Sequence, residues 1–572
     1  ECDLQDQSMF YGIDKSRYKE NKRFVPEKYM GPLIKTQMTR CIHCTRCIRF
    51  ATEIAGVPEL GAIGRGEDMQ ITTYLEKSME SELSANVIDL CPVGALTSKP
   101  YVFEARPWEL KKTETIDVMD AVGSNIRVDT YGWEVKRILP RINEDINEEW
   151  ISDKSRYACD GLQNQRLDTP YIKKNGVFTK SSWDDAYEIV SKKIYSSRSE
   201  EIAGLTGDLT NMENLFIIKE FFSKTIKSPY LDSRPEHSFI NNNERSNYLF
   251  NSSISGIEES DFILLIGSNP RYEASILNAR IRKSYLKNNT EIFSMGDLGN
   301  LTYPYKILNN STQTIKDIVD EKHEISEKIK KSKKPIIILG QSIFKLESAN
   351  YIVQNLKEFL KKNNKINENW NSFNVLSNHA STVGSYDLNI LSSNGKINKV
   401  IDGINNKNFK VLFLFGQDNI NFKKNDEFII YIGSHGDKGA EISDVILPGS
   451  AYTEQDGLFT NMEGKLQKAY KASYPPGESK EDWIIINELS EKIKSKKLFK
   501  NKDELEKSLM NYLKLNQQEK NYDNSENIEF VNEKINLNEI DYYYSNVIAR
   551  SSKTMGECRS EKIKLKDSST YG

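Results

Sequence analysis

Four cysteines constrain this chain more than any other feature of its sequence. Cys41, Cys44 and Cys47 recur at every third residue, and Cys91 follows later, directly before Pro92. A 4Fe–4S cluster needs four thiolates that converge on one small inorganic core. A Cys-x-x-Cys-x-x-Cys loop can supply three of them, and a distant Cys-Pro can supply the fourth. Structural zinc sites usually take their ligands as two separated pairs. The spacing therefore favours an iron–sulfur cluster over zinc, which is the competing interpretation.

Size and composition exclude several classes of protein. At 572 residues the chain is too long for a single core. Its 79 basic and 82 acidic residues nearly cancel, so it lacks the basic excess of a nucleic-acid-binding protein. Seven cysteines, an odd number, indicate a reducing compartment rather than a disulfide framework. No apolar run approaches the ~18 residues that a membrane span needs, and no secretory or transit signature opens the chain.

The composition changes along the chain and predicts four parts. Residues 1–105 hold five of the seven cysteines and form the predicted iron–sulfur domain. Residues 106–162 read as a small β module of short alternating strands. Residues 163–500 alternate helices with short apolar runs. Residues 501–572 form a polar C-terminal extension, in which Asn516 to Asn527 is expected to cross the surface.

Three apolar runs in the third part predict buried parallel strands. They cover residues 262–267, 335–340 and 411–416, and each ends in glycine. Because each run is apolar at successive positions, we expect strands covered on both faces. A helical segment at 274–286 follows the first of them. The predicted fold is α/β with one or two doubly wound parallel sheets, preceded by the small β module and a small α+β iron–sulfur part.

Motifs along nearly the whole chain resemble one family. They are Glu1 to Gln7, Thr39 to Cys47, Cys91 to Thr97, Asp117 to Asn125, Asp145 to Ser152, Gly267 to Arg271, Leu447 to Gly449, Glu454 to Gly457 and Asn461 to Gly464. The chain resembles the large iron–sulfur subunits of respiratory complex I, the 75 kDa subunits of NADH:quinone oxidoreductase. That family is related to the molybdopterin oxidoreductases.

The resemblance implies a set of cluster ligands. Cys41, Cys44, Cys47 and Cys91 match the four thiolates of one 4Fe–4S cluster. Cys2 matches the last ligand of a second 4Fe–4S cluster, whose other ligands lie upstream in the family. The chain begins at Glu1-Cys2 without them and is expected to be part of a longer product or to be completed by a separate polypeptide. The family's 2Fe–2S cluster, in a ferredoxin-like domain, is expected only in that missing part.

The β module resembles a 4Fe–4S domain that has lost its ligands. The three leading ligand positions are expected at Asp117, Asp120 and Ser124, and only Cys159 remains as a thiol. Aspartate and serine offer hard oxygen donors, which suit iron–sulfur chemistry poorly. This second site is therefore predicted to be empty, with Cys159 as an ordinary buried thiol. Cys558 is predicted to be a free thiol in the polar C-terminal part.

The residues around the cysteine loop have less defined roles. Backbone N–H groups of residues 42–48 are expected to donate to the sulfurs. Arg40 and Arg46 flank the loop, where they either raise the cluster potential or face solvent. His43 lies inside the loop, but four cysteines already complete a ligand set, so it is not expected to bind iron.

The predicted function is electron relay within the peripheral arm of complex I, from NADH oxidation towards quinone. The chain would be part of an NADH dehydrogenase without a substrate site of its own and without molybdopterin. Implied partners are the NADH/FMN-binding subunit and other iron–sulfur subunits, with the membrane reached only through the complex. The implied location is the cytoplasmic side of a bacterial inner membrane or the matrix side of the mitochondrial inner membrane. The alternatives are a molybdopterin-dependent oxidoreductase similar to formate dehydrogenase and a zinc-stabilised scaffold.

Overall fold

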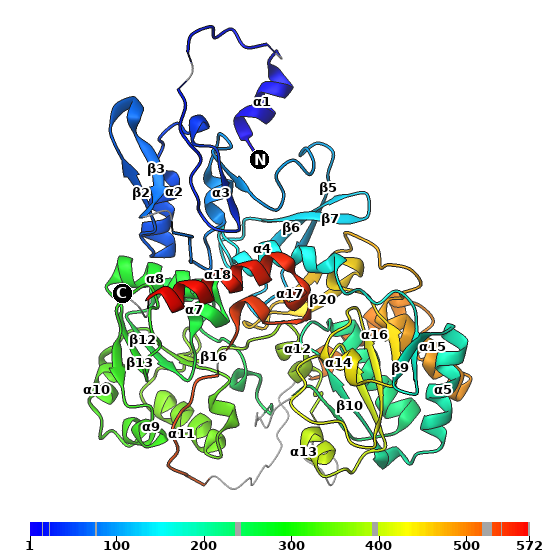
Figure 1. Cartoon of the computed structure of the whole chain (residues 1–572). Helices are drawn as coiled ribbons and strands as arrows, with labels where there is room; N and C mark the ends of the chain where they lie inside the picture. The colour runs from blue at the N-terminus through cyan, green and yellow to red at the C-terminus, as the bar shows by residue number, and fades with distance from the viewer. Residues whose placement is uncertain are drawn as a thin grey trace.

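The protein has an N-terminal cysteine-rich region resting on two α/β lobes (Figure 1). The structure is a computed structural model that describes residues 1–13, 15–21, 23–74, 77–234, 242–391, 399–516, 529–538 and 540–569. In Figure 1 the cysteine-rich region is blue, one lobe is mainly green, and the other combines teal and yellow segments. The C-terminal helices, in red, lie between the cysteine-rich region and the lobes.

The cysteine-rich region is built from short elements held by two small antiparallel sheets. β1 pairs with β4 and β2 pairs with β3. Its elements are α1 (Asp3–Tyr11), β1 (Ile34–Thr36), η1 (Met38–Arg40), α2 (Arg46–Arg49), η2 (Phe50–Ala55), β2 (Leu60–Ile63), η3 (Gly66–Asp68), β3 (Gln70–Thr73), α3 (Asn86–Leu90) and β4 (Leu96–Ser98). The β1–β4 pairing brings the segment after Cys91 back beside the segment before Cys41.

The predicted β module is present as a three-stranded antiparallel sheet. It contains β5 (Lys111–Ile116), β6 (Asn125–Tyr131) and β7 (Glu134–Pro140), followed by α4 (Asp153–Tyr157) and η5 (Ala158–Gln163). Buried and partly exposed positions alternate along the first part of β7, as in a strand with one face on a core. The predicted strands at 125–129 and 134–139 are thus confirmed.

One lobe contains a seven-stranded sheet in the order β11-β10-β17-β18-β19-β8-β9. Its strands are β8 (Tyr171–Lys174), β9 (Val177–Lys180), β10 (Ile202–Thr206), β11 (Leu231–Asp232), β17 (Val411–Phe415), β18 (Phe428–Gly433) and β19 (Val445–Pro448). The helices of this lobe include α5 (Trp183–Tyr195), α6 (Met212–Glu220), η7 (Phe221–Ile226), α13 (Val400–Asn405), α14 (Lys438–Ile442), α15 (Asp482–Lys494) and α16 (Lys502–Asn516). Five strands are parallel, and the β8–β9 hairpin adds an antiparallel edge that the sequence did not indicate.

The other lobe contains a five-stranded sheet that is parallel throughout, in the order β14-β13-β12-β15-β16. Its strands are β12 (Phe262–Ile266), β13 (Glu291–Met295), β14 (Lys306–Leu308), β15 (Pro335–Leu339) and β16 (Phe373–Val375). Its helices include α7 (Pro270–Glu273), α8 (Ser275–Asn288), α9 (Thr312–Val319), α10 (Glu324–Lys331) and α11 (Ala349–Lys362), and α12 (Thr382–Asp387) follows β16. The three predicted apolar runs are β12, β15 and β17, each wholly buried.

The part after residue 500 is only partly a polar extension. Leu505 and Leu509 of α16 are buried in the core of the seven-stranded lobe. The last residues form η12 (Tyr542–Tyr544), α17 (Val547–Ser551) and α18 (Lys553–Ser569), and Cys558 is buried in α18. The expected surface stretch from Asn516 to Asn527 lies outside the described residues beyond position 516.

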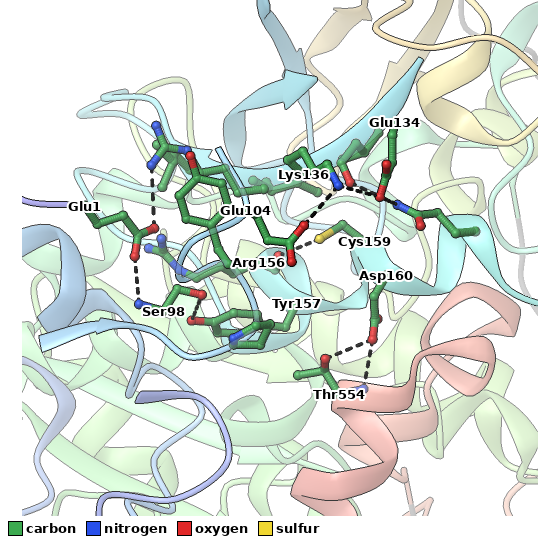
Figure 2. Close-up of a pocket in the computed structure, with 17 residues that line it drawn as sticks. Glu1, Ser98, Glu104, Glu134, Lys136, Arg156, Tyr157, Cys159, Asp160 and Thr554 are labelled. Atoms are coloured by element: carbon green, nitrogen blue, oxygen red, sulfur yellow. Dashed lines mark hydrogen bonds and ion pairs between the residues drawn. The ribbon is translucent and has the colours of Figure 1, made fainter. Parts of the chain in front are cut away.

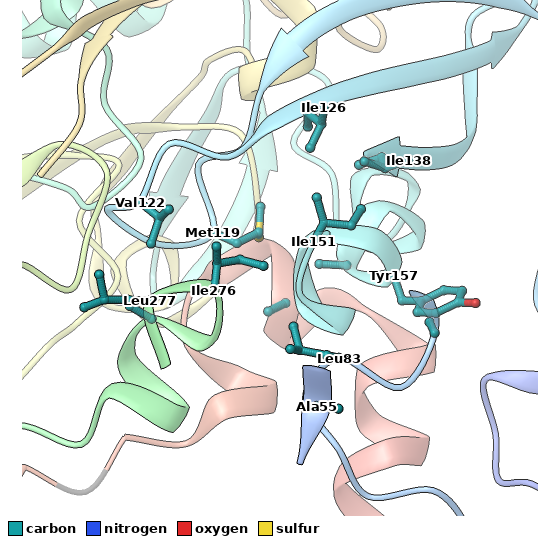
Figure 3. Close-up of a cluster of buried hydrophobic side chains, with 14 of the residues drawn as sticks. Ala55, Leu83, Met119, Val122, Ile126, Ile138, Ile151, Tyr157, Ile276 and Leu277 are labelled. Atoms are coloured by element: carbon teal, nitrogen blue, oxygen red, sulfur yellow. The ribbon is translucent and has the colours of Figure 1, made fainter. Parts of the chain in front are cut away.

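One hydrophobic core joins the cysteine-rich region to the rest of the molecule. Figure 3 shows Leu83 of that region close to Ile151 and Tyr157, with Met119 and Ile276 in the same cluster. The β20 (Gly457–Thr460) and β21 (Leu466–Ala469) hairpin packs against β5 and contributes to the same core. Among the described residues, no helix combines the length and apolar content needed to cross a bilayer.

Candidate iron–sulfur site

The cysteine loop has an unusual backbone on both sides of Cys44. Cys41 caps the end of η1, and α2 begins at Arg46. His43 and Thr45 have φ angles of 55° and 60°, the left-handed conformation. For a residue with a side chain this costs about 1–2 kcal/mol, and such strain persists where the surroundings impose it, often at functional sites. These two left-handed residues turn the chain on both sides of Cys44, so that three thiols lie within seven residues.

The four predicted ligands gather around one cavity. It is lined by Cys41, Cys44, Cys47 and Cys91, together with apolar side chains that include Met38, Ile71, Leu90, Val93 and Leu96. Burial, followed by the neighbouring thiols of Cys91, Cys41 and Cys44, raises the pKa of Cys47 to about 12. Burial, then Cys91 and Cys44, likewise raises the pKa of Cys41. The donor set and the apolar wall suit a soft inorganic core, which would replace the thiol protons.

The four thiols can be compared with the requirements of a zinc site. Among the described ranges, no group of three or more His, Cys, Asp or Glu side chains is arranged to hold one metal ion. A zinc site needs sulfur atoms at about 2.3 Å from a common centre. Four thiols that line one apolar-walled cavity are the number of thiolates that a 4Fe–4S cluster needs.

Backbone N–H groups point at the sulfurs, as predicted for part of the loop. The N–H of His43 donates to Sγ of Cys41 at 3.4 Å. The N–H of Ile48 donates to Cys47 and opposes the rise in its pKa. Such bonds are one of the means by which a protein sets a cluster potential. Arg40 and Arg46 are both exposed, which agrees with the interpretation that they face solvent.

His43 has a structural partner outside the cavity. Its Nε2 lies 2.8 Å from Nη1 of Arg23, whose other nitrogen donates to the carbonyl of Met69. The imidazole therefore links the loop to the segments before it and after it, and it is not among the groups that line the cavity.

Cys91 directly follows helix α3, and the first residue of that helix is hydrogen-bonded to the β module. Cys91 caps the end of α3, and Asn86 begins that helix with its side chain fully buried. Asn86 Nδ2 donates to the carbonyls of Leu83 and Ile151 at 2.9 and 2.8 Å, and its Oδ1 accepts from Ile151 N at 3.2 Å. Asp153 accepts from the backbone N–H groups of Ser84 and Ala85 at 3.1 and 2.9 Å. Neither Asn86 nor Asp153 was singled out from the sequence, because the contacts of Asn86 with Ile151 and of Asp153 with Ser84 and Ala85 join residues more than 60 positions apart.

The five-stranded lobe also holds the cysteine-rich region in place. Arg271 of α7 donates to Glu82 at 2.7 Å, and both side chains are nearly buried. Arg282 of α8 donates to the carbonyls of Thr52 and Glu53 in η2. These contacts orient the segments on either side of α3 and the loop.

Cys2 lies close to the segment that follows Cys91. Its side chain is 9% exposed, and its Sγ accepts from Gln5 N at 3.3 Å at the start of α1. Leu4 N donates to the carbonyl of Pro92 at 3.1 Å. Cys2 is not among the residues that line the four-cysteine cavity, and its assignment to a second cluster stays a prediction.

The predicted empty site in the β module is filled by hydrogen-bonded oxygen and nitrogen groups. Ser155 Oγ donates to Asp117 at 2.5 Å and lies 2.7 Å from Ser152 Oγ. Lys154 Nζ lies 3.6 Å from Asp120 Oδ2, with both side chains buried. Burial, followed by the nearby Asp120, raises the pKa of Asp117 to about 7. The sequence did not indicate this network, whose serines and lysine follow one another in α4 and its cap.

Cys159 is the buried thiol that the sequence predicts. Its Sγ donates to the carbonyl of Arg156 at 3.4 Å, and burial raises its pKa to about 12. Ser124 contributes its backbone carbonyl, which accepts from Asp117 N at 2.8 Å.

Known proteins match this chain along nearly its whole length. The NADH-ubiquinone oxidoreductase 75 kDa subunit of Reclinomonas americana is 46% identical over 583 residues, covering 98% of this chain and 84% of the relative. This chain belongs to the 75 kDa subunit family. An NADH-quinone oxidoreductase subunit from Rickettsia bellii (strain RML369-C) is 44% identical, with 98% and 82% coverage. The mitochondrial 78 kDa subunit of Candida albicans is 43% identical, with 98% and 79% coverage.

Three family descriptions match separate parts of this member of the 75 kDa subunit family. Residues 31–97 match "NADH-quinone oxidoreductase subunit 3, ferredoxin-like domain", and this range contains all four cysteines of the cavity. Residues 110–160 match "NADH-ubiquinone oxidoreductase NDSU1/NuoG-like, 4Fe-4S domain", and residues 166–492 match "Molybdopterin oxidoreductase". A ferredoxin-like domain therefore lies within the chain, at the cysteine cavity, whereas the resemblance implied such a domain only upstream of Glu1.

Proposed function

We propose that this chain is an electron-relay iron–sulfur subunit of respiratory complex I. It would form part of an NADH dehydrogenase complex and carry electrons from NADH oxidation towards quinone. The observation that carries the proposal is the cavity lined by Cys41, Cys44, Cys47 and Cys91 within the ferredoxin-like range. When bound there, a 4Fe–4S cluster supplies one-electron oxidation and reduction.

The residues of the chain would hold this cluster and set its environment. The four thiolates are the proposed ligands, and the N–H groups that reach Cys41 and Cys47 would stabilise the reduced form. Asn86 and Asp153 fix the helix that carries Cys91. The apolar wall keeps water from the inner face, while the half-exposed cysteines lie towards the surface.

The two parallel-sheet lobes would serve as a scaffold without molybdopterin. Ligands of such sheets bind outside the carboxyl ends of the strands, where the strand order reverses. Here the reversals fall between β10 and β17 and between β12 and β15. A Cβ on Gly207 would lie 1.8 Å from the Gly416 carbonyl, and one on Gly340 would lie 2.0 Å from the Gly267 carbonyl. The backbones that leave neighbouring strands are thus in direct contact at both reversals, which supports the proposal of a scaffold role.

The remaining assignments follow from the family resemblance. Cys2 would be the last ligand of a second 4Fe–4S cluster whose other ligands come from outside residues 1–572. The partners would be other peripheral-arm subunits, including the one that binds NADH and FMN. The location would be the cytoplasmic face of a bacterial inner membrane or the matrix face of the mitochondrial inner membrane.

Metal and sulfide analysis of the full chain tests the proposal. We expect the iron and acid-labile sulfide of one 4Fe–4S cluster in the reconstituted wild type, and no stable cluster in a Cys44→Ala variant. Cys159→Ala is the matched control, because it removes a buried thiol away from the cavity and should leave the iron content unchanged. Zinc in place of iron would support the scaffold alternative, and bound molybdenum or tungsten would support the molybdopterin alternative.

A further inference from the structure

The segment that follows Cys91 is in contact with the first residues of the chain at three points. The Pro92 carbonyl accepts from Leu4 N at 3.1 Å. Ser98 N donates to the Glu1 carboxylate at 2.7 Å, a contact that is drawn in Figure 2. Between them, Gly94 lies directly against Cys2. The short segment that begins at Cys91 therefore also packs against Cys2.

Gly94 has no room for a side chain. A Cβ at this position would lie 2.9 Å from Cβ of Cys2, 3.1 Å from the carbonyl oxygen of Glu1 and 3.5 Å from a guanidinium nitrogen of Arg40. Two of these neighbours belong to the backbone or to the first side-chain carbon, so they cannot move aside cheaply. The φ of Gly94 is also +63°, which disfavours any other residue.

We propose that Gly94 is a positioning residue that fixes Cys2, the proposed ligand of a second cluster, against the segment that follows Cys91. The inference rests on the proposed function, because the position of Cys2 beside Cys91 matters for electron transfer only if each of them holds a cluster. Electron transfer between two centres depends on how the intervening segment holds them. A glycine lets the backbone after Pro92 approach Cys2 more closely than any other residue would.

The test compares two glycines with similar positive φ angles. Gly132 has φ +60°, but a Cβ there would meet nothing within 4 Å. Gly94→Ala and Gly132→Ala should therefore cost a similar backbone free energy. Only the Gly94→Ala methyl group would clash with Cys2. The measurement is the rate of Cys2 alkylation in the reconstituted full chain, followed by peptide mass mapping. We expect this rate to be about tenfold higher in Gly94→Ala, because the packing around Cys2 opens locally more often. Gly132→Ala should match the wild type.

Internal thiols and the cluster separate this effect from unfolding. Cys159 and Cys558 are buried and should stay unreactive in every folded variant. The visible absorbance and EPR signal of the four-cysteine cluster should persist in Gly94→Ala, which a general loss of structure would not allow. Equal Cys2 reactivity in the Gly94 and Gly132 variants would overturn the inference.

A second pair of variants decides the matter if Gly94→Ala does not fold. Leu4→Pro removes the N–H that bonds to Pro92, and proline is tolerated in the first turn of a helix. Leu4→Ala keeps the N–H and is its control. Faster Cys2 alkylation in Leu4→Pro alone would support the inference, and equal rates would reject it. Absence of iron from the wild type would instead reject the proposed function, whatever the Cys2 rates are.

Discussion

Replacing Asn86 with alanine should loosen the ligand Cys91 without touching any cysteine. Asn86 is fully buried and makes three hydrogen bonds to the backbone of Leu83 and Ile151. Its removal leaves the Ile151 N–H and two carbonyls without these partners. The Leu83 carbonyl still accepts from the backbone N–H of residue 86, so the N–H and the carbonyl of Ile151 are the groups to count. An unsatisfied buried group costs about 1–3 kcal/mol, which gives about 2–6 kcal/mol for the two. Because Asn86 starts the helix that ends at Cys91, we expect this cost to appear as easier opening of the cluster site.

The rate at which iron is lost to a chelator measures that opening. Even the lower limit of about 2 kcal/mol corresponds to a roughly 30-fold faster loss. Asn374→Ala is the matched control: this asparagine is also fully buried and makes three hydrogen bonds, to Ser252 and Ser372, in the five-stranded lobe. Both variants should melt at lower temperature, but only Asn86→Ala should release iron faster. Equal iron loss from the two variants would refute the role assigned to Asn86.

Three further predictions concern the fold around the site. Burial raises the pKa of Glu273 to about 7, so the folded state binds an extra proton between about pH 4.5 and 7. Its contribution to the free energy of unfolding should fall by about 3 kcal/mol as pH rises through that window, and Glu273→Gln should flatten the change of melting temperature with pH. Leu509→Ala should cost about 2–5 kcal/mol in urea unfolding, whereas Leu515→Ala, at an exposed position of the same helix, should change stability by less than about 0.5 kcal/mol. Arg271→Met should lower the free energy of unfolding by about 3–5 kcal/mol, because it leaves the buried Glu82 carboxylate without its main partner. Calorimetry measures this loss, and an unchanged stability would contradict the role of the pair.

The local patterns of the sequence predicted much of this architecture. The apolar runs at β12, β15 and β17 could be assigned because successive buried positions followed by glycine are typical of parallel strands. The cysteine spacing likewise predicted which thiols meet in one cavity. Both signals lie within a short window of the chain.

Features that depend on distant contacts could not be predicted in the same way. The hydrogen bonds of Asn86 to Ile151 and the contact of Gly94 with Cys2 join residues 65 and more positions apart. Cys558 was expected in a polar tail, yet it is buried three residues after the buried Met555. The spacing of these two residues on one helix face was a signal, but the charged residues around them obscured it.

The β module has a buried polar network at the positions where the resemblance implies lost cluster ligands. In the range that matches a 4Fe–4S domain, Asp117 and Asp120 are bonded to Ser155 and Lys154 rather than left unpaired. A buried polar network of this kind is stable only when its members satisfy one another. The network supports our proposal that this second position now has a structural role.

Low-temperature EPR of the dithionite-reduced full chain tests the central claim most directly. The account predicts one 4Fe–4S signal in the wild type that disappears in Cys44→Ala and remains in Cys159→Ala. A colourless protein that contains zinc and has no such signal, or a signal that survives in Cys44→Ala, would contradict it.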